Sequence, residues 1–242
     1  MKAIILAAGL GTRMGEVTRD KPKALVQVNG VPMLGLLIER LKKQGIKKFM
    51  VNVHHFGDQV INYIEKNGRF GVDISVSDER NELLDTGGAI LKARDFFHGD
   101  EHVLVHNVDV LSDVNLIKLL NDHQNSDALA SLVVRKRKSG RALLFDGDMQ
   151  LTGWADLENK KYKWVNVPVE DFETFAYSGI YLATPSFAEK LPFTGCFSII
   201  DALLKMAKTE RIIGWPDASP VWFDLGTKEK IIAAEKYLKS NK

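Results

Sequence analysis

The 242-residue sequence predicts an α/β fold in three layers, with a mostly parallel central sheet and a smaller antiparallel extension. Three observations lead to this prediction. Short apolar runs of strand length alternate with amphipathic helical segments through the first half of the chain. Helices that separate strands in this way connect parallel strands through right-handed crossovers. After Ala128, several strand-like segments follow one another with only turn residues between them, which is typical of antiparallel pairing.

The first half alternates strands and helices, an order that predicts a Rossmann-like sheet. Its helices carry apolar residues at helical spacing, such as Leu37 and Leu41, and Gly45 follows the first helix as a C-terminal stop. The predicted strands are Ala3 to Ala8, Lys48 to Val53, Val72 to Val76 and His102 to Asn107. The predicted helices are Val31 to Gln44, Asp58 to Lys66, Gly87 to Phe97 and Asp113 to His123.

The second half begins with segments that read as strands separated by turn residues such as Ser139-Gly140. The predicted strands there are Ala128 to Val134, Arg141 to Phe145, Gln150 to Trp154 and Phe175 to Ala183. A helix over Ile199 to Lys208, a strand over Val221 to Leu225 and a helix over Lys228 to Leu238 close the chain. We expect the antiparallel strands to be additions to the central sheet.

Composition excludes several classes of protein. Hydrophobic residues make up 45% and charged residues 26%, as in an ordinary globular protein. The net charge of +2 is too small to indicate nucleic-acid binding, and the basic run Arg135 to Lys138 is interpreted as a solvated turn. No stretch is long enough to cross a membrane, and no signal peptide is readable. The sequence has a single cysteine, Cys196, which we interpret as a small buried residue of the core. One cysteine permits no internal disulfide, which fits a reducing cytosol, so we expect a cytoplasmic protein.

The segment Leu6 to Met14, which reads L-A-A-G-L-G-T-R-M, has the features of a phosphate-binding loop. Gly9 and Gly11 permit backbone angles that other residues avoid, so that successive amides can turn toward one anion. Arg13 adds a planar fork of donors for phosphate oxygens. Pro22 fixes the chain just before Lys23, which argues against an ordinary solvated lysine there.

Two better-known glycine motifs are excluded by spacing. The dinucleotide fingerprint G-x-G-x-x-G would need a glycine where this chain has Met14, and no G-K-S or G-K-T tripeptide of a P-loop occurs. An ordinary strand-to-loop turn with a surface arginine is the alternative. The combination of A-A-G, T-R and the later P-K with Lys23 argues against an ordinary turn.

The pattern L-A-A-G-x-G-T-R-M followed by K-P-K-A-L resembles the sugar-1-phosphate nucleotidyltransferases. Further segments resemble motifs of the same family, and they run through essentially the whole chain. These segments are Gly45 to Val53, Asp85 to Ala89 (D-T-G-G-A), Val105 to Asp109 and Trp222 to Thr227 (W-F-D-L-G-T). Within the family, the short chain and the wording of the last motifs most resemble the uridylyltransferases of N-acetylmuramate 1-phosphate. The length of the chain predicts one α/β domain, 1–242, or one with a small excursion. With the resemblance, 1–127 is expected to be its nucleotide-binding half and 128–242 its acceptor-side half.

The reaction that this resemblance implies is attack by a sugar 1-phosphate on the α-phosphorus of a nucleoside triphosphate, with release of pyrophosphate. It implies that Asp109 and Asp224 bind Mg²⁺, that Arg13 holds the β- and γ-phosphates, and that Lys23 neutralises charge between the α-phosphate and the acceptor. Mg²⁺ prefers oxygen ligands from one or two carboxylates, substrate phosphates and water. The alternative for Asp109 is a helix N-cap, for which Ser112 and Asp113 are better placed.

The same resemblance implies contacts to the nucleotide from the loop, from the D-T-G-G-A segment and from the strand before Asp109. The residues concerned are Ala7, Ala8, Gly9, Gly11, Thr12, Arg13, Asp85, Gly87, Gly88 and Asn107. Gly87 and Gly88 open a helix, where we expect their amides to be free. Close relatives often read N-G-D before the metal-binding aspartate, whereas this chain has Val108 in place of the glycine. Whether the metal loop can turn as tightly with valine is therefore an open point. Asn52, His54 and His55 end a strand, where acceptor contacts, base contacts and a structural role remain open.

The acceptor side lacks the E-K-P motif that many hexose-1-phosphate enzymes carry. Gly140, Glu170, Ser178 and Gly179 lie in the matching region and are the candidate sugar-binding residues. We expect UTP as donor, with N-acetylmuramate 1-phosphate as the first acceptor to test. Transfer from GTP to a mannose or heptose phosphate, transfer from CTP, and a catalytically silent paralogue that senses sugar nucleotides remain alternatives. The oligomeric state is left open.

Overall fold

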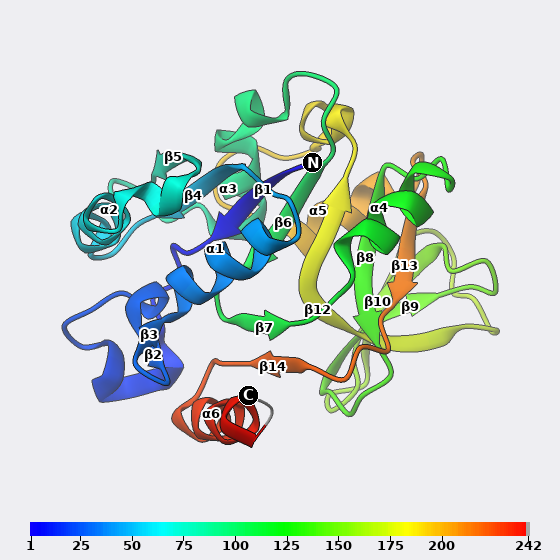
Figure 1. The fold of residues 1–242 in the computed structure, drawn as a ribbon. Coiled ribbons are helices and arrows are strands. Elements are labelled where there is room, and N and C mark those ends of the chain that lie inside the picture. Colours follow the sequence, from blue (N-terminus) through cyan, green and yellow to red (C-terminus); the bar gives the residue numbers. More distant parts are fainter. Residues whose placement is uncertain (241–242) are drawn as a thin grey trace. The chain divides into compact units, whose positions relative to one another are not determined.

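The computed structural model describes residues 1–240, so the last two residues of the predicted domain, 241 and 242, lie outside the described part. Its class is mixed α/β with a mostly parallel central sheet, as predicted (Figure 1). The chain forms two compact units. One consists of Met1–Leu83, His106–Asp113 and the chain from Pro220 onward, and the other of Leu84–Val105 and Val114–Ser219. The functional division at residues 127 and 128 stays a prediction.

The first unit is built on three parallel strands, in which Ala3 pairs with Phe49 and Met50 with Ser75. The strands are β1 (Lys2–Leu6), β4 (Lys48–Val53) and β5 (Asp73–Asp78), in the order β1-β4-β5. Helices α1 (Met33–Lys43) and α2 (Gly57–Lys66) connect them, labelled in Figure 1. The left-handed backbone at Gly45 (φ 91°) ends α1 as predicted.

Several shorter elements complete this unit. Val31 and Pro32 pair with β2 and form a hairpin strand, so α1 begins two residues later than predicted. The hairpin turns through Asn29 and Gly30, both with positive φ. The further elements are β2 (Gln27–Val28), β3 (Val31–Pro32), β7 (Val110–Ser112), β14 (Trp222–Asp224) and α6 (Lys228–Ser240), with 3₁₀ helices over Thr12–Thr18, Lys23–Leu25 and Gly68–Gly71.

The second unit is dominated by antiparallel strands, as predicted for the later part of the chain. Its strands are β6 (Val103–Asn107, whose last two residues belong to the first unit), β8 (Ala130–Arg135), β9 (Arg141–Phe145), β10 (Leu151–Asp156), β11 (Lys161–Trp164), β12 (Glu173–Ala183) and β13 (Ile212–Pro216). They pair in the order β11-β10-β9-β12, while β8 lies between β12 and β13. The β8–β13 pairing is parallel. Neither β11 nor β13 was predicted.

Helices α3 (Asp85–Lys92), α4 (Leu116–Gln124) and α5 (Ile199–Met206) belong to the second unit, with 3₁₀ helices over Arg94–Phe97 and Pro185–Lys190. The predicted start of α4 was wrong. Asn115 caps it, because its side-chain oxygen accepts from the amide of Lys118 at 2.9 Å. Ser112 instead belongs to β7.

Two further expectations from composition meet the structure. Cys196 is exposed, so the expectation of a small buried residue was wrong. Arg135, which opens the basic run, is not a solvated charge, because it forms an ion pair with the buried Asp217. Among residues 1–240, no helix combines the length and the apolar composition that a bilayer crossing requires.

Candidate active site

The carboxyl ends of β1, β4 and β5 are tied together by one buried amide. Asn52, at the end of β4, accepts hydrogen bonds from the amides of Ala7 at 2.6 Å and Ala8 at 3.2 Å. Its side-chain nitrogen donates to Oε1 of Glu79, just after β5, at 2.9 Å. Asn52 and Glu79 are 4% and 1% exposed. Ligands of open parallel sheets bind at this end of the strands. The hydrogen bonds of Asn52 thus fix the start of the predicted phosphate loop at the place where a ligand is expected.

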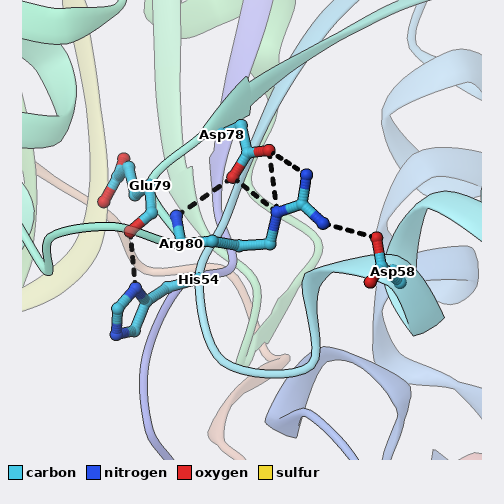
Figure 2. Close-up of polar contacts among 5 residues, drawn as sticks. All are labelled: His54, Asp58, Asp78, Glu79 and Arg80. Atoms are coloured by element: carbon cyan, nitrogen blue, oxygen red, sulfur yellow. Dashed lines mark hydrogen bonds and ion pairs between the residues drawn. The ribbon is translucent and has the colours of Figure 1, made fainter.

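A second layer of contacts holds the two loops that follow β4 and β5, as Figure 2 shows. His54 donates through Nδ1 to the backbone oxygen of Glu79 at 2.6 Å. Arg80 forms ion pairs with Asp78, at 2.5 Å, and with Asp58 of α2, at 2.6 Å. Bonds to Asp78 and the nearby charge of Asp58 raise the pKa of the Arg80 guanidinium. The structure therefore supports a structural role for Asn52 and His54 among those left open by the sequence.

Within the loop, the two glycines have different roles. Gly11 has φ 67°, and a side chain there would come within 2.9 Å of Thr18 and 3.3 Å of Lys23. The Thr18 hydroxyl donates to the Gly11 oxygen at 3.0 Å. Gly9 has no positive φ and open space around it, so the prediction of special backbone angles was right for Gly11 and wrong for Gly9. Because the amides of Ala7 and Ala8 already bond to Asn52, only their carbonyl groups remain for a ligand.

Lys23 is buried and paired with a carboxylate. Only 10% of its side chain and 16% of that of Asp109 are exposed, and Nζ of Lys23 bonds to Oδ2 of Asp109. Pro22 precedes a short 3₁₀ helix that begins at Lys23, so the lysine is held by regular backbone. The reading of Lys23 as a solvated surface lysine is therefore wrong.

Asp224 lies at the end of β14 beside a second cation. Burial opposes ionisation of its carboxyl, but the bond and the charge of Lys230 outweigh this effect, so the pKa of Asp224 is lowered. The carboxylate also accepts from the amide of Gly226 at 2.9 Å. A side chain at Gly226 would come within 2.7 Å of the Asp224 carboxylate and 3.1 Å of the Arg13 guanidinium. The glycine of W-F-D-L-G-T thus lets Arg13, which is exposed next to Thr12, approach Asp224.

The two predicted metal-binding residues, Asp109 and Asp224, lie at the same end of the strand pair β7–β14. Strand β14 pairs antiparallel with β7, with Asp224 opposite Val110, and the amide of Leu225 donates to the oxygen of Asp109 at 2.7 Å. Both carboxylates are ion-paired with lysines, so each lies beside one positive charge. No group of three or more potential ligands occurs in the described chain. Two carboxylates fit Mg²⁺ that takes its other ligands from phosphates and water.

The turn before Asp109 accommodates Val108 without strain. Val108 is 4% exposed, has no positive φ, and donates its amide to the oxygen of Leu6 at 3.1 Å. A glycine is therefore not required in this turn. Asn107 ends β6, and its backbone oxygen bonds to Nδ1 of the buried His106 at 2.8 Å.

The D-T-G-G-A segment lies in the second unit, at the start of α3. The amides of Gly87 and Gly88 donate to the backbone oxygen of Phe197, at 2.8 and 3.3 Å, so the expectation that they are free was wrong. A side chain at either glycine would collide with the 195–197 segment. Asp85 adopts a left-handed backbone (φ 56°) and accepts from the amide of Thr86 at 2.6 Å. The glycines are thus explained by packing, and ligand contacts of this segment stay a prediction.

The four sugar-binding candidates also lie in the second unit, in different surroundings. Gly140 precedes β9 and faces Glu158, whose carboxylate a side chain would meet at 2.6 Å. Ser178 is buried, and Gly179 (φ 77°) forms an irregularity in β12. Glu170 is exposed in the loop before β12. Their part in sugar binding stays a prediction.

Sequence reasoning missed Glu79 and Lys230 as parts of the first-unit network. Glu79 directly follows β5, which runs two residues further than the predicted strand Val72 to Val76, and an acidic residue just past a strand is a signal that could have been used. Lys230 lies six residues beyond Asp224, on the first turns of α6, and only the folded helix shows that it reaches the carboxylate.

Comparison with known proteins gives consistent results. A family model described as nucleotidyl transferase matches residues 2–145. An N-acetylmuramate alpha-1-phosphate uridylyltransferase of Caulobacter vibrioides is 29% identical, over 98% of this chain and 96% of its own length. A D-glycero-alpha-D-manno-heptose 1-phosphate guanylyltransferase of Campylobacter jejuni is 38% identical, over 54% of this chain and 58% of its own length.

Among solved structures, HddC from Yersinia pseudotuberculosis complexed with GMP-PN is similar, with a TM-score of 0.78. The match covers 98% of this chain and 99% of that one at 24% identity, so it is a likeness of fold alone.

Proposed function

Because the chain belongs to the nucleotidyl transferase family, whose similar members here act on sugar 1-phosphates, we propose that it joins UTP and a sugar 1-phosphate. The products are a UDP-sugar and pyrophosphate. The observation that carries this proposal is the convergence of Arg13, Lys23, Asp109 and Asp224 in the first unit, although they come from three separate stretches of sequence.

In the proposed reaction, a phosphate oxygen of the sugar 1-phosphate attacks the α-phosphorus of the triphosphate. A new P–O bond forms, the bond to the bridging oxygen of the β-phosphate breaks, and pyrophosphate leaves with that electron pair. Both reactants are polyanions, so the protein must position them and neutralise their charge.

Lys23 supplies a cation that is already oriented. Its burial against Asp109 holds Nζ in place before substrate arrives, so little reorganisation is needed when charge builds on the α-phosphate. Arg13, exposed at the loop and close to Gly226, would bind the terminal phosphates with its planar fork.

Asp109 and Asp224 would hold Mg²⁺ beside the two lysines that pair with them. When bound, the ion would neutralise phosphate charge and favour departure of pyrophosphate. The pairing of both aspartates with cations supports this assignment.

The relative from Caulobacter vibrioides, which matches nearly the whole chain, supports UTP as donor and N-acetylmuramate 1-phosphate as acceptor. The relative from Campylobacter jejuni favours a second candidate, guanylyl transfer to a heptose 1-phosphate, but it matches about half of this chain.

The test is a panel of four nucleoside triphosphates against several sugar 1-phosphates, scored by pyrophosphate release. The acceptors should include the 1-phosphates of N-acetylmuramate, N-acetylglucosamine, glucose, mannose and a heptose. We expect release with UTP to exceed release with the other donors. A clear preference for GTP or CTP would overturn the donor, use of glucose 1-phosphate alone would overturn the acceptor, and no release with any pair would favour a silent sensor.

A further inference from the structure

A cavity of about 440 Å³ lies in the second unit, between the sheet face of β9, β10 and β11 and the start of α5. The strand register places Leu143, Trp154 and Lys163 side by side across three strands on this face. Tyr177 of β12 and Asp201 of α5 complete the walls. The volume is within the range of small-molecule sites, and an aromatic wall with a few polar groups is typical of them.

The cavity is bounded by the same segment that holds the D-T-G-G-A loop. Ser198 lines the cavity and caps α5, and the next amide, that of Ile199, donates to the hydroxyl of Thr86 at 3.0 Å. The residue before Ser198, Phe197, accepts the amide of Gly87 at 2.8 Å. A ligand against Ser198 is therefore two residues or fewer from the contacts that fix this loop.

The charges of the cavity are unevenly matched. Nζ of Lys163 forms an ion pair with Asp201 at 2.6 Å, so that pair is neutral. Arg141 also lines the cavity, and its guanidinium forms no ion pair with any carboxylate among residues 1–240. Asp156, which faces Arg141 in the register, accepts two hydrogen bonds from Asn159, at 2.9 and 3.0 Å. These bonds, and to a smaller degree the charge of Arg141, lower the pKa of Asp156, but the two side chains form no direct ion pair.

We propose that this cavity binds the sugar of the acceptor and that Arg141 binds a carboxylate carried by that sugar. An arginine fork bonds a planar carboxylate through two parallel hydrogen bonds, which gives both affinity and selectivity. Trp154 and Tyr177 contribute aromatic surface to the cavity wall. The inference rests on the proposed function, and it names a specificity residue that lies outside the predicted sugar-binding set.

The test uses two acceptors that differ only in the acidic group. N-acetylmuramate 1-phosphate carries a lactyl carboxylate that N-acetylglucosamine 1-phosphate lacks, while both carry the same phosphate. In Arg141→Gln, we expect kcat/KM for the acidic acceptor to fall about 10- to 100-fold, through KM, because a bond to a charged group is lost. The value for the neutral acceptor should change less than about threefold.

Arg94→Gln is the matched control, because Arg94 is an exposed arginine of the same unit that, within residues 1–240, forms an ion pair with its neighbour Asp95 alone, at 3.8 Å. It should leave both acceptors unchanged. Equal losses for both acceptors in Arg141→Gln would mean that Arg141 holds the phosphate or the fold, and unchanged values would mean that it contacts neither. Either result overturns the inference while the proposed function stands.

A binding measurement separates the two proposals when turnover fails. Calorimetry with N-acetylmuramic acid, which has no phosphate, should show binding to the unmodified protein and at least tenfold weaker binding to Arg141→Gln. N-acetylglucosamine should bind both proteins equally. If no nucleotide is transferred but this difference is seen, the proposed function falls and the acidic-sugar cavity is supported. If pyrophosphate is released but the difference is absent, only the cavity assignment falls.

Discussion

Replacing Asn52 with alanine removes the side chain that links the ends of three neighbouring strands. The change leaves the amides of Ala7 and Ala8 without their acceptor, and it leaves one oxygen of Glu79 without its donor. All four residues are at least nine-tenths buried, so bulk water cannot take over these bonds.

The expected cost follows from these three bonds. Each buried polar group left without a partner destabilises a protein by about 1–3 kcal/mol. The 3.2 Å bond from Ala8 is the longest, and Glu79 retains other interactions, so both contribute at the lower end. We therefore expect Asn52→Ala to lower the free energy of unfolding by about 3–5 kcal/mol, a large part of the roughly 5–15 kcal/mol that is usual.

The assay is urea unfolding followed by far-ultraviolet circular dichroism, with the midpoint and the slope fitted separately. Asn166→Ala, at an exposed loop position, is the control and should change stability by less than about 0.5 kcal/mol. In the folded fraction, the phosphate loop loses its anchor, so KM for the triphosphate should also rise.

Variants that keep the size of the Asn52 side chain test its hydrogen bonds separately from the loss of side-chain volume. Asn52→Asp retains the acceptor for both amides but sets a second carboxylate against Glu79, which raises the pKa of one of them. The folded protein then binds a proton that the unfolded chain releases, so stability should fall as pH rises through that pKa. The double variant Asn52→Asp/Glu79→Gln should recover most of the loss. A cost below about 1 kcal/mol for Asn52→Ala, or no recovery in the double variant, would refute the argument.

Three further predictions concern catalysis and pH. Asp109→Ala and Asp224→Ala should abolish Mg²⁺-dependent pyrophosphate release with an unchanged circular dichroism spectrum; near-normal release at limiting Mg²⁺ would contradict the metal assignment. Lys23→Ala should lower kcat roughly 100- to 1000-fold, whereas Arg13→Ala should mainly raise KM for the triphosphate; a change in KM alone for Lys23→Ala would contradict its role. Burial lowers the pKa of His123 to about 4, so the unfolded chain binds more protons below pH 6.5, and this histidine should account for about 2 kcal/mol of the stability lost from pH 7 to pH 5; the loss should be smaller by about that amount in His123→Asn.

Some elements could be predicted from the sequence because local patterns determine them. Strands Lys48–Val53 and Arg141–Phe145 have the predicted bounds, and Gly45 ends α1 as expected. A buried strand between turn residues and a glycine after a helix are recognisable without knowledge of the neighbours.

Other elements depend on partners far away in sequence. Strand β11 has no buried residue, so it lacks the apolar alternation that marks a strand, and its pairing with β10 defines it. Strand β13 contains a glycine and ends in a proline, which read as turn signals, yet it pairs in parallel with β8. Pairing energy, rather than local propensity, decides such segments.

For the candidate site, the sequence by itself determined which charged residues to expect: Arg13, Lys23, Asp109 and Asp224. Only the tertiary structure decided how they are held. In the folded chain Lys23 is buried against Asp109, Arg13 lies beside Gly226, and the amides of Ala7 and Ala8 donate to the side chain of Asn52. The physical reason is that a motif specifies residue types along the chain, whereas burial and hydrogen-bond partners depend on which segments the fold brings together.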